Sequence, residues 1–119
     1  MGSAHSLRAG VAVTVDVRPF PRLGWDPLPN ATHIVGRLLV REDDFFVAQL
    51  RFSEHAAIEE HAGTRDTIVV CIEGEGFTSV GGETVPLREG QQVRWPRDVV
   101  HGLWTEESTM TTLMIERFE

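Results

Sequence analysis

Hydrophobic and polar residues alternate along much of this chain with a period of two. The first alternating segment covers residues 11–17, where valines occupy every odd position and Ala12, Thr14 and Asp16 lie between them. Alternation of this length is typical of a strand that buries a single face. The pattern therefore predicts a strand over residues 11–17.

Prolines interrupt the pattern immediately afterwards. Residues 18–30 contain four prolines, and because proline has no amide hydrogen, such a stretch is excluded from the interior of a sheet or helix. We expect an extended arm on the surface, with Trp25 as its anchor. Residues 1–10 are expected to be a flexible N-terminus, because their first six residues are mostly small and polar and have no period.

The rest of the chain consists of short runs rich in β-branched and aromatic residues. Gly81-Gly82 between two of these runs is typical of a two-residue hairpin, because tight hairpin turns need positive φ angles. Residues 53–62 are the one candidate helix, but Ala56 stands three residues after Ser53, where a capping box needs glutamate or glutamine, and a strand or loop is favoured there. The predicted strands are residues 34–41, 44–52, 67–73, 75–80, 83–87, 91–95, 99–104 and 110–118. We predict one all-β domain over residues 11–119, built as an antiparallel sandwich or barrel.

Composition narrows the classes of partner. The 119 residues carry 18 acidic side chains against 11 basic ones, a formal net charge of -7. Nucleic acids and anionic membranes are bound mainly by clustered positive charge, so neither is expected as a partner. A single cysteine, Cys71, offers no internal disulfide, and no apolar run approaches the length of a membrane span. We expect a soluble, cytoplasmic protein.

Residues 90–101 carry the first sign of a family. Gly90, Pro96 and His101 fall at the spacings of the second conserved motif of the cupin family, which this segment resembles. Asp98 stands where that motif has a second glycine, and Thr105 stands where it has an asparagine. Aspartate tolerates the left-handed turn conformation better than most residues, so the first replacement preserves the turn.

The segment ending at residues 73–76 resembles the close of the first cupin motif. Counting back from Gly74 places Thr67 where the family has a metal-binding glutamate, and places His61 and Gly63 at its His-x-His pair. The resemblance covers residues 31–116 and implies a small jelly-roll barrel, often dimeric. Of the four positions that usually hold the family's metal, only His61 and His101 carry ligand side chains.

Two interpretations of these histidines stay open. In the first, His61 and His101 hold a divalent transition metal (Ni, Zn, Fe or Mn), and Glu59 completes a two-histidine, one-carboxylate set if its strand is regular. In the second, the two histidines line a metal-free pocket. The resemblance implies that they project into the same cavity in either case.

Strand parity predicts the rest of the pocket lining. With His101 pointing inward, Val99 and Leu103 point inward too. On the strand that begins at residue 67, the inward residues would be Thr67, Val69 and Cys71. Trp95, just before Pro96, either forms a pocket wall or packs under the turn.

The same parity places Ile68, Val70 and Ile72 outward, so the strand is apolar on both faces and needs cover on both. We expect a homodimer to supply the outer cover, with the proline-rich arm as the alternative.

The predicted function is that of a cupin barrel that binds a small organic molecule at a weakened metal site. Whether it is an enzyme stays open. The resemblance implies metal-dependent oxidoreductase (dioxygenase), isomerase or lyase chemistry if it is one. The alternative is a non-catalytic, metal-free binding or sensor barrel, supported by the missing ligands at Gly63 and Thr67.

Overall fold

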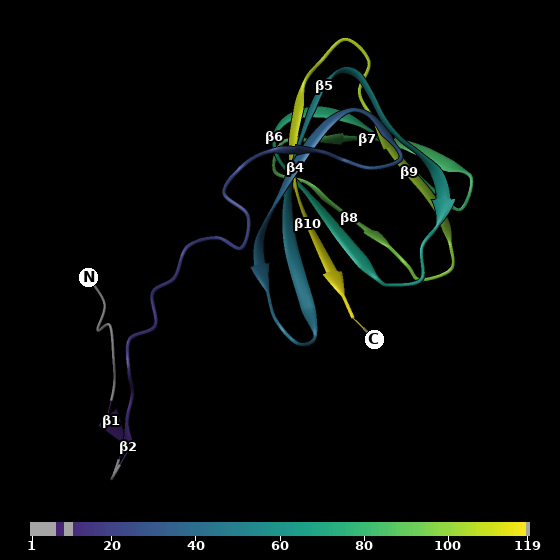
Figure 1. The fold of residues 1–119 in the computed structure, drawn as a ribbon. Coiled ribbons are helices and arrows are strands. Elements are labelled where there is room, and N and C mark those ends of the chain that lie inside the picture. Colours follow the sequence, from purple (N-terminus) through teal and green to yellow (C-terminus); the bar gives the residue numbers. More distant parts are fainter. Residues whose placement is uncertain (1–6, 9–10, 119) are drawn as a thin grey trace.

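The computed structural model describes residues 7–8 and 11–118, and this part of the chain contains strands and no helix (Figure 1). Eight strands form the main sheet, and β1 and β2 form a separate two-stranded pair. The strands are β1 (Leu7–Arg8), β2 (Val11–Ala12), β3 (Asp26–Pro27), β4 (Ala31–Arg41), β5 (Phe45–Ala62), β6 (Thr67–Val80), β7 (Glu83–Arg88), β8 (Gln92–Trp95), β9 (Val100–Trp104) and β10 (Met110–Arg117).

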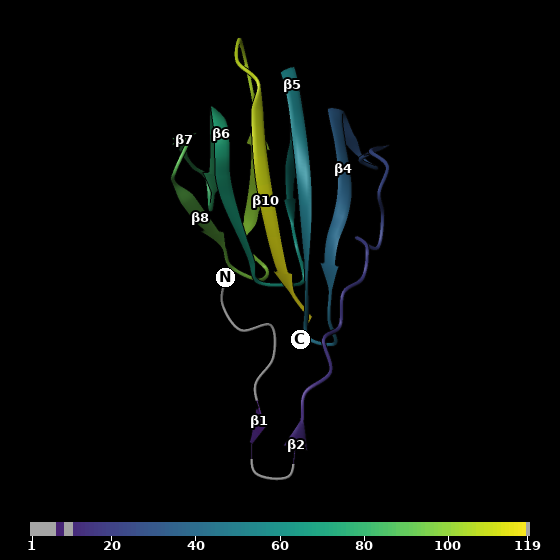
Figure 2. The ribbon, with the colours of Figure 1, turned by 90° about the vertical axis from the view of Figure 1, so that its left-hand side faces the viewer.

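The two longest strands close the sheet into a barrel. In β5, residues 45–52 pair with β10 and residues 57–62 pair with β9; in β6, residues 67–74 pair with β10 and residues 77–80 pair with β9. Each long strand therefore crosses from one neighbour to the other, and all these pairings are antiparallel (Figure 2). The predicted all-β, antiparallel jelly-roll fold is confirmed.

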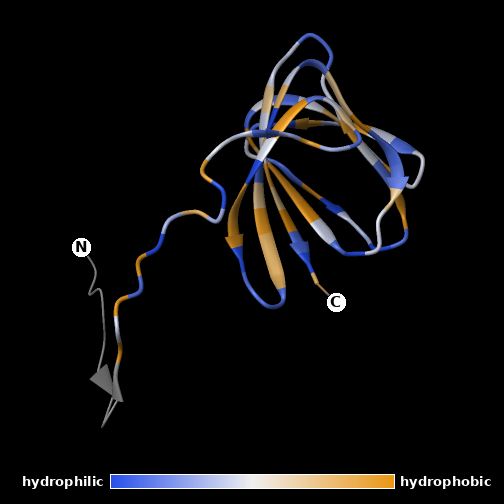
Figure 3. Cartoon of the chain, viewed as in Figure 1, coloured by the Kyte–Doolittle hydropathy of each residue, from blue (hydrophilic) through white to orange (hydrophobic). Residues whose placement is uncertain are grey.

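Alternation within the strands fills the barrel with apolar side chains. Phe52, Leu103 and Val69 are among the fully buried residues, and each comes from a different strand. Figure 3 shows hydrophobic positions interspersed with hydrophilic ones along the strands, while several connecting loops are hydrophilic. This is the pattern of a sheet that packs one face inward.

Turn chemistry follows the sequence closely. Gly81 and Gly82, between β6 and β7, have φ angles of 61° and 88°, as the hairpin prediction requires. Asp98 has a φ angle of 66°, the left-handed conformation in which a glycine would be unstrained. The exchange of glycine for aspartate therefore preserves the turn that leads into β9.

One expectation about local structure is confirmed and one is wrong. Residues 53–62, where the sequence favours a strand or loop over a helix, belong to the strand β5. The strand predicted over residues 11–17 covers only Val11–Ala12, and Val15 and Val17 are 51% and 88% exposed. The alternating valines give this segment one apolar face, but in the described residues β2 pairs only with the two-residue strand β1. No neighbouring strand therefore extends the pairing beyond Ala12. Of the expected flexible segment 1–10, residues 1–6 and 9–10 lie outside the described part of the chain.

The second half of the proline-rich arm lies along the edge strand β4 and not over β6: β3 (Asp26–Pro27) pairs with β4, and Leu28 N donates to the Ile34 carbonyl oxygen at 2.9 Å. Figures 1 and 2 show residues 11–20 running away from the strands of the main sheet. Trp25 anchors the arm to the barrel, as expected. The guanidinium groups of Arg37 on β4 and Arg51 on β5 lie 4.5 and 4.3 Å from the centroid of the Trp25 ring. Ile72 on β6 is 41% exposed, so within one chain the arm does not complete the outer cover. No helix in the described residues could span a membrane.

Candidate functional site

A cavity of about 510 Å³ opens where the ends of β5, β6, β8, β9 and β10 meet the start of β4. His61 and His101 line it together with Thr67, Trp95 and Gly63. Its apolar walls come from Ile58, Met114, Leu28, Pro29 and Ala31, and its remaining polar residues are Asn30, Glu59, Glu60 and Glu116. We call this cavity the histidine pocket.

The histidines face each other across a strand pair. His61 on β5 is the register partner of His101 on β9, and their ring centroids lie 4.6 Å apart in an edge-to-face arrangement. His101 is only 3% exposed, whereas His61 is exposed to solvent. The family resemblance placed these two residues in one cavity, and the structure does bring them together.

Main-chain carbonyls fix the tautomer of both rings. Nδ1 of His61 lies 3.0 Å from the Glu59 carbonyl oxygen, and Nδ1 of His101 lies 3.1 Å from the Val99 carbonyl oxygen. A carbonyl oxygen only accepts hydrogen bonds, so each neutral ring must carry its proton on Nδ1 and leave Nε2 with a lone pair. No hydrogen bond found among the described residues uses either Nε2 atom.

A buried stack holds the ring of His101. The Trp95 ring lies 4.0 Å from it, with an angle of 12° between the planes. Trp95 Nε1 donates to Thr78 Oγ1 at 3.0 Å, and Thr78 Oγ1 donates to the Gly102 carbonyl at 2.8 Å. Both buried polar groups are therefore satisfied, and the indole is fixed in place against the imidazole.

Burial also sets the charge of His101. The pKa of His101 is lowered by its removal from water and by the neighbouring His61, and the Val99 carbonyl opposes this only in part. The ring is consequently neutral at neutral pH. It presents Nε2 as a hydrogen-bond acceptor or base.

Glu116 belongs to the pocket, although the sequence did not single it out. It pairs with Thr67 across β10 and β6 and lines the cavity. Burial raises the pKa of its carboxyl group, and the charge of Arg65, with that of His61 when it is protonated, opposes that rise. Parity could have found it: Thr112, Met114 and Glu116 occupy alternate positions of the predicted strand 110–118.

The other predicted pocket residues divide into two groups. Thr67 and Trp95 line the pocket as predicted, and Trp95 forms a wall by packing on His101. The prediction is wrong for Val69, Cys71 and Leu103, which are completely buried in the core and do not border the cavity. Val99 does not border it either; only its carbonyl contacts His101. Inward parity alone does not distinguish pocket from core, because both lie on the same face of a strand.

The regular strand assumed for Glu59 is also wrong. The register of β5 against β9 shifts between Ile58 and His61, so a bulge separates Glu59 from the histidine. Glu59 still borders the pocket, and its carbonyl accepts the hydrogen bond from His61. Glu60 borders the pocket too, but its carboxylate accepts a hydrogen bond from Ser79 Oγ at 2.7 Å and its Cγ lies beside Gly102.

The donor set suits a metal in type but not in number. Two neutral imidazoles with free Nε2 atoms are ligands that late first-row metals accept. Catalytic zinc sites, however, use three protein ligands and structural ones use four. The described residues contain no group of three or more histidine, cysteine, aspartate or glutamate side chains arranged to hold a metal. The residues present thus do not fit the expected metal centre.

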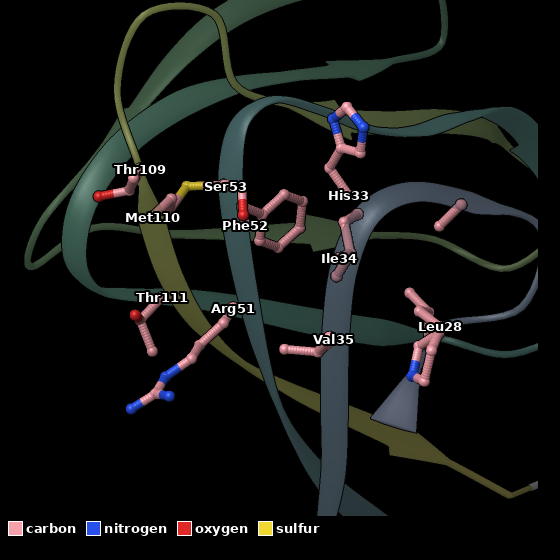
Figure 4. Close-up of a pocket in the computed structure, with 12 residues that line it drawn as sticks. Leu28, His33, Ile34, Val35, Arg51, Phe52, Ser53, Thr109, Met110 and Thr111 are labelled. Atoms are coloured by element: carbon pink, nitrogen blue, oxygen red, sulfur yellow. The ribbon is translucent and has the colours of Figure 1, made fainter. Parts of the chain in front are cut away.

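A larger cavity, of about 790 Å³, lies along β4, β5 and the start of β10 (Figure 4). Its titratable or charged side chains are His33 and Arg51, which point to opposite sides of the view. Size alone would favour this cavity. The histidine pocket is the better candidate, because it brings the buried His101 together with His61 and three glutamates.

Comparisons with known proteins agree with this fold. A family model described as a cupin domain matches residues 49–116. None of the curated proteins compared with the sequence matches it.

Among solved structures, the polyketide cyclase RemF from Streptomyces resistomycificus is similar, with a TM-score of 0.76 and 19% identity over 90% of this chain and 81% of that chain. An RmlC-like cupin from Shewanella frigidimarina gives a TM-score of 0.72 and 17% identity, with 79% and 82% covered. KdgF from Halomonas sp. gives 0.71 and 20%, with 79% and 86% covered. At these identities the likeness shows the fold alone.

Proposed function

The chain belongs to the cupin-domain family, and from that premise we propose that it binds a small organic molecule in the histidine pocket and transfers protons to and from it. The observation that carries this proposal is the pair His61 and His101. Both rings have their Nδ1–H committed to the main chain, so both present a free Nε2 at one cavity.

The two rings suit different roles. A proton accepted by His61 comes to lie beside the carboxylate of Glu116, and solvent reaches the ring, so the resulting positive charge is stabilised. A proton on His101 would place the charge in a buried position against Trp95. His61 is therefore the general base, and His101 remains neutral and orients the ligand by accepting a hydrogen bond.

The reaction class that follows is proton abstraction next to a carbonyl group, as in isomerases and some lyases. The C–H proton of the ligand moves to His61 Nε2 and the electron pair forms an enolate, whose oxygen can accept hydrogen bonds from the side chains of Thr67 and Asn30 in the lining. The imidazolium then returns a proton to carbon. The alternative is a non-catalytic barrel that uses the same pocket for binding alone.

Hydrogen exchange tests the proposal without knowledge of the natural ligand. In D2O, NMR spectroscopy follows the exchange of the α-protons of cyclohexanone, a neutral ketone. We expect the protein to accelerate exchange above the buffer rate, His61→Asn to abolish the acceleration, and His101→Asn to reduce it. His33→Asn is the matched control, because His33 lies outside this pocket. Acceleration that survives His61→Asn would contradict the assigned base, and exchange at the buffer rate with ligand binding intact would favour the non-catalytic alternative.

We also propose that two copies associate through the outer face of β6. Ile72 on β6 is 41% exposed, and Ile68 and Val70, at alternate positions of the same strand, are half-buried. Sedimentation equilibrium of the wild type and of Ile72→Glu checks this: the wild type is expected to sediment as a dimer at micromolar concentration and the variant as a monomer. A monomeric wild type would contradict the proposal.

A further inference from the structure

The polar lining of the histidine pocket consists almost entirely of hydrogen-bond acceptors. His61 and His101 offer lone pairs at Nε2, because the other nitrogen of each ring donates to a carbonyl. Glu116 and Glu59 add carboxylate oxygens. Trp95 and the two histidines also have N–H donors, but these are engaged with Thr78 Oγ1 and with main-chain carbonyls. Among the described lining residues, Thr67 and Asn30 are the ones whose side-chain donors are not engaged in this way.

The charge of the lining has one sign. Three glutamates and no arginine border this cavity in the described residues, within a chain of net charge -7. Arg65 is close enough to Glu116 to affect its pKa, but its guanidinium lies 4.9 Å from the ring centroid of Phe118 and it does not line the pocket. A negatively charged ligand would therefore meet repulsion and find few donors.

A second observation points from this lining to a ligand. His101 is 97% buried, counted from its 3% exposure, and its unpartnered Nε2 belongs to a residue that borders the cavity. Nε2 is not among the fully buried unpartnered atoms of the described residues, so it is accessible from the cavity, where an N–H donor of a ligand can bind it. Ile58 and Met114 supply apolar surface beside it.

We propose that the histidine pocket selects small organic cations of the ammonium class with an apolar body, and rejects carboxylates. The N–H donors of such a ligand bind the free Nε2 of His101, its charge is balanced by Glu116, and its body packs on the apolar wall. Nε2 of His61 stays free to act as the base. This inference rests on the proposed function, because it assigns the chemistry of the molecule that the pocket binds.

A matched set of three probes tests the charge preference. Benzylammonium, benzamide and benzoate share one ring and differ mainly in charge and in donor count. Calorimetry at neutral pH gives their dissociation constants, and ¹H–¹⁵N spectra of the histidine rings show whether each binds at His61 and His101. We expect benzylammonium to bind about tenfold more tightly than benzamide, as expected for a hydrogen bond to a charged group, and benzoate to bind most weakly.

A charge variant sharpens the test. Glu116→Gln should bring benzylammonium and benzamide to similar affinity, while Glu83→Gln, on β7 away from the pocket, should leave the ratio unchanged. If Glu116→Gln does not fold, the wild-type ratio decides alone. Benzoate binding as tightly as benzylammonium would overturn the charge preference and leave the proposed function standing. Failure of all three probes to perturb either histidine would count against the proposed function and would overturn this inference with it.

Discussion

The histidine pocket has two unlike sides. On its buried side, His101 stacks on Trp95 and every neighbouring donor is satisfied within the fold. On its open side, solvent-exposed His61 follows a bulge in β5, and half-buried Glu116 on β10 is close enough for the two charges to interact. The difference teaches that the two sides contribute different properties to the pocket. The buried side fixes the orientation of the His101 ring, and the open side contains the groups that can change their charge.

Removing the indole of Trp95 should disrupt the packing around His101 and cause the largest loss of stability. Trp95→Ala is expected to destabilise the fold by about 3–5 kcal/mol, because it empties a packed site beside His101. Urea denaturation followed by circular dichroism measures this. Trp25→Ala, at the half-buried anchor of the arm, should lower the free energy of unfolding much less. Equal losses in the two variants would show that the stack of Trp95 on His101 contributes no more to stability than the anchor of the arm.

A smaller effect is expected from the hydroxyl beneath the indole. Thr78→Val removes the acceptor of Trp95 Nε1 and the donor to the Gly102 carbonyl, which should cost about 1–3 kcal/mol. Thr112→Val is the matched control, because Thr112 is equally buried but its Oγ1 has no partner within the described residues. We expect Thr112→Val to be neutral or stabilising. A similar loss in both variants would mean that methyl packing, not hydrogen bonding, governs the site.

The resemblance to a known motif anticipated the buried side because that side depends on local spacing. Gly90, Pro96 and His101 set one turn and one strand, and Asp98 adopts the left-handed angle that the turn needs. The open side depends on pairings between distant segments. The bulge before His61 and the placement of Glu116 opposite Thr67 arise only when β5, β6, β9 and β10 assemble, and alternation within one segment does not encode them.

The two sides should also respond oppositely to pH. The pKa of His101 is lowered in the folded state, so below the ordinary pKa of about 6.5 the unfolded chain binds more protons and stability falls as pH falls. The pKa of Glu116 is raised, so the folded state holds this proton more tightly than the unfolded chain does. The protonated carboxyl group therefore stabilises the fold at low pH, and this stabilisation is lost as the pH rises through the folded pKa.

Urea denaturation between pH 7 and 5 should therefore show that the free energy of unfolding declines as the pH falls. His101→Gln should reduce this decline, and Glu116→Gln should steepen it. A decline unaffected by His101→Gln would contradict the assigned burial effect.

Metal binding should give the smallest effect. With two converging imidazoles and no group of three ligands in the described residues, we expect Ni²⁺, Zn²⁺, Fe²⁺ and Mn²⁺ to bind far more weakly than in a three- or four-ligand site. Calorimetry with chelator-free protein and with His101→Ala checks this. Tight, stoichiometric binding that His101→Ala abolishes would restore the metal-centred interpretation of His61, His101 and Glu59.

Barrel closure by β9 and β10 has a consequence for how the chain folds. His61 meets His101 only after β9 has inserted between β5 and β6, strands that are far from it in the sequence. Pairings between distant segments form slowly, because the loop entropy must be lost before the contacts compensate for it. The two imidazoles should therefore come together late in refolding, after the local β6–β7 hairpin has formed, and the pocket should be the last part of the barrel to acquire its native geometry.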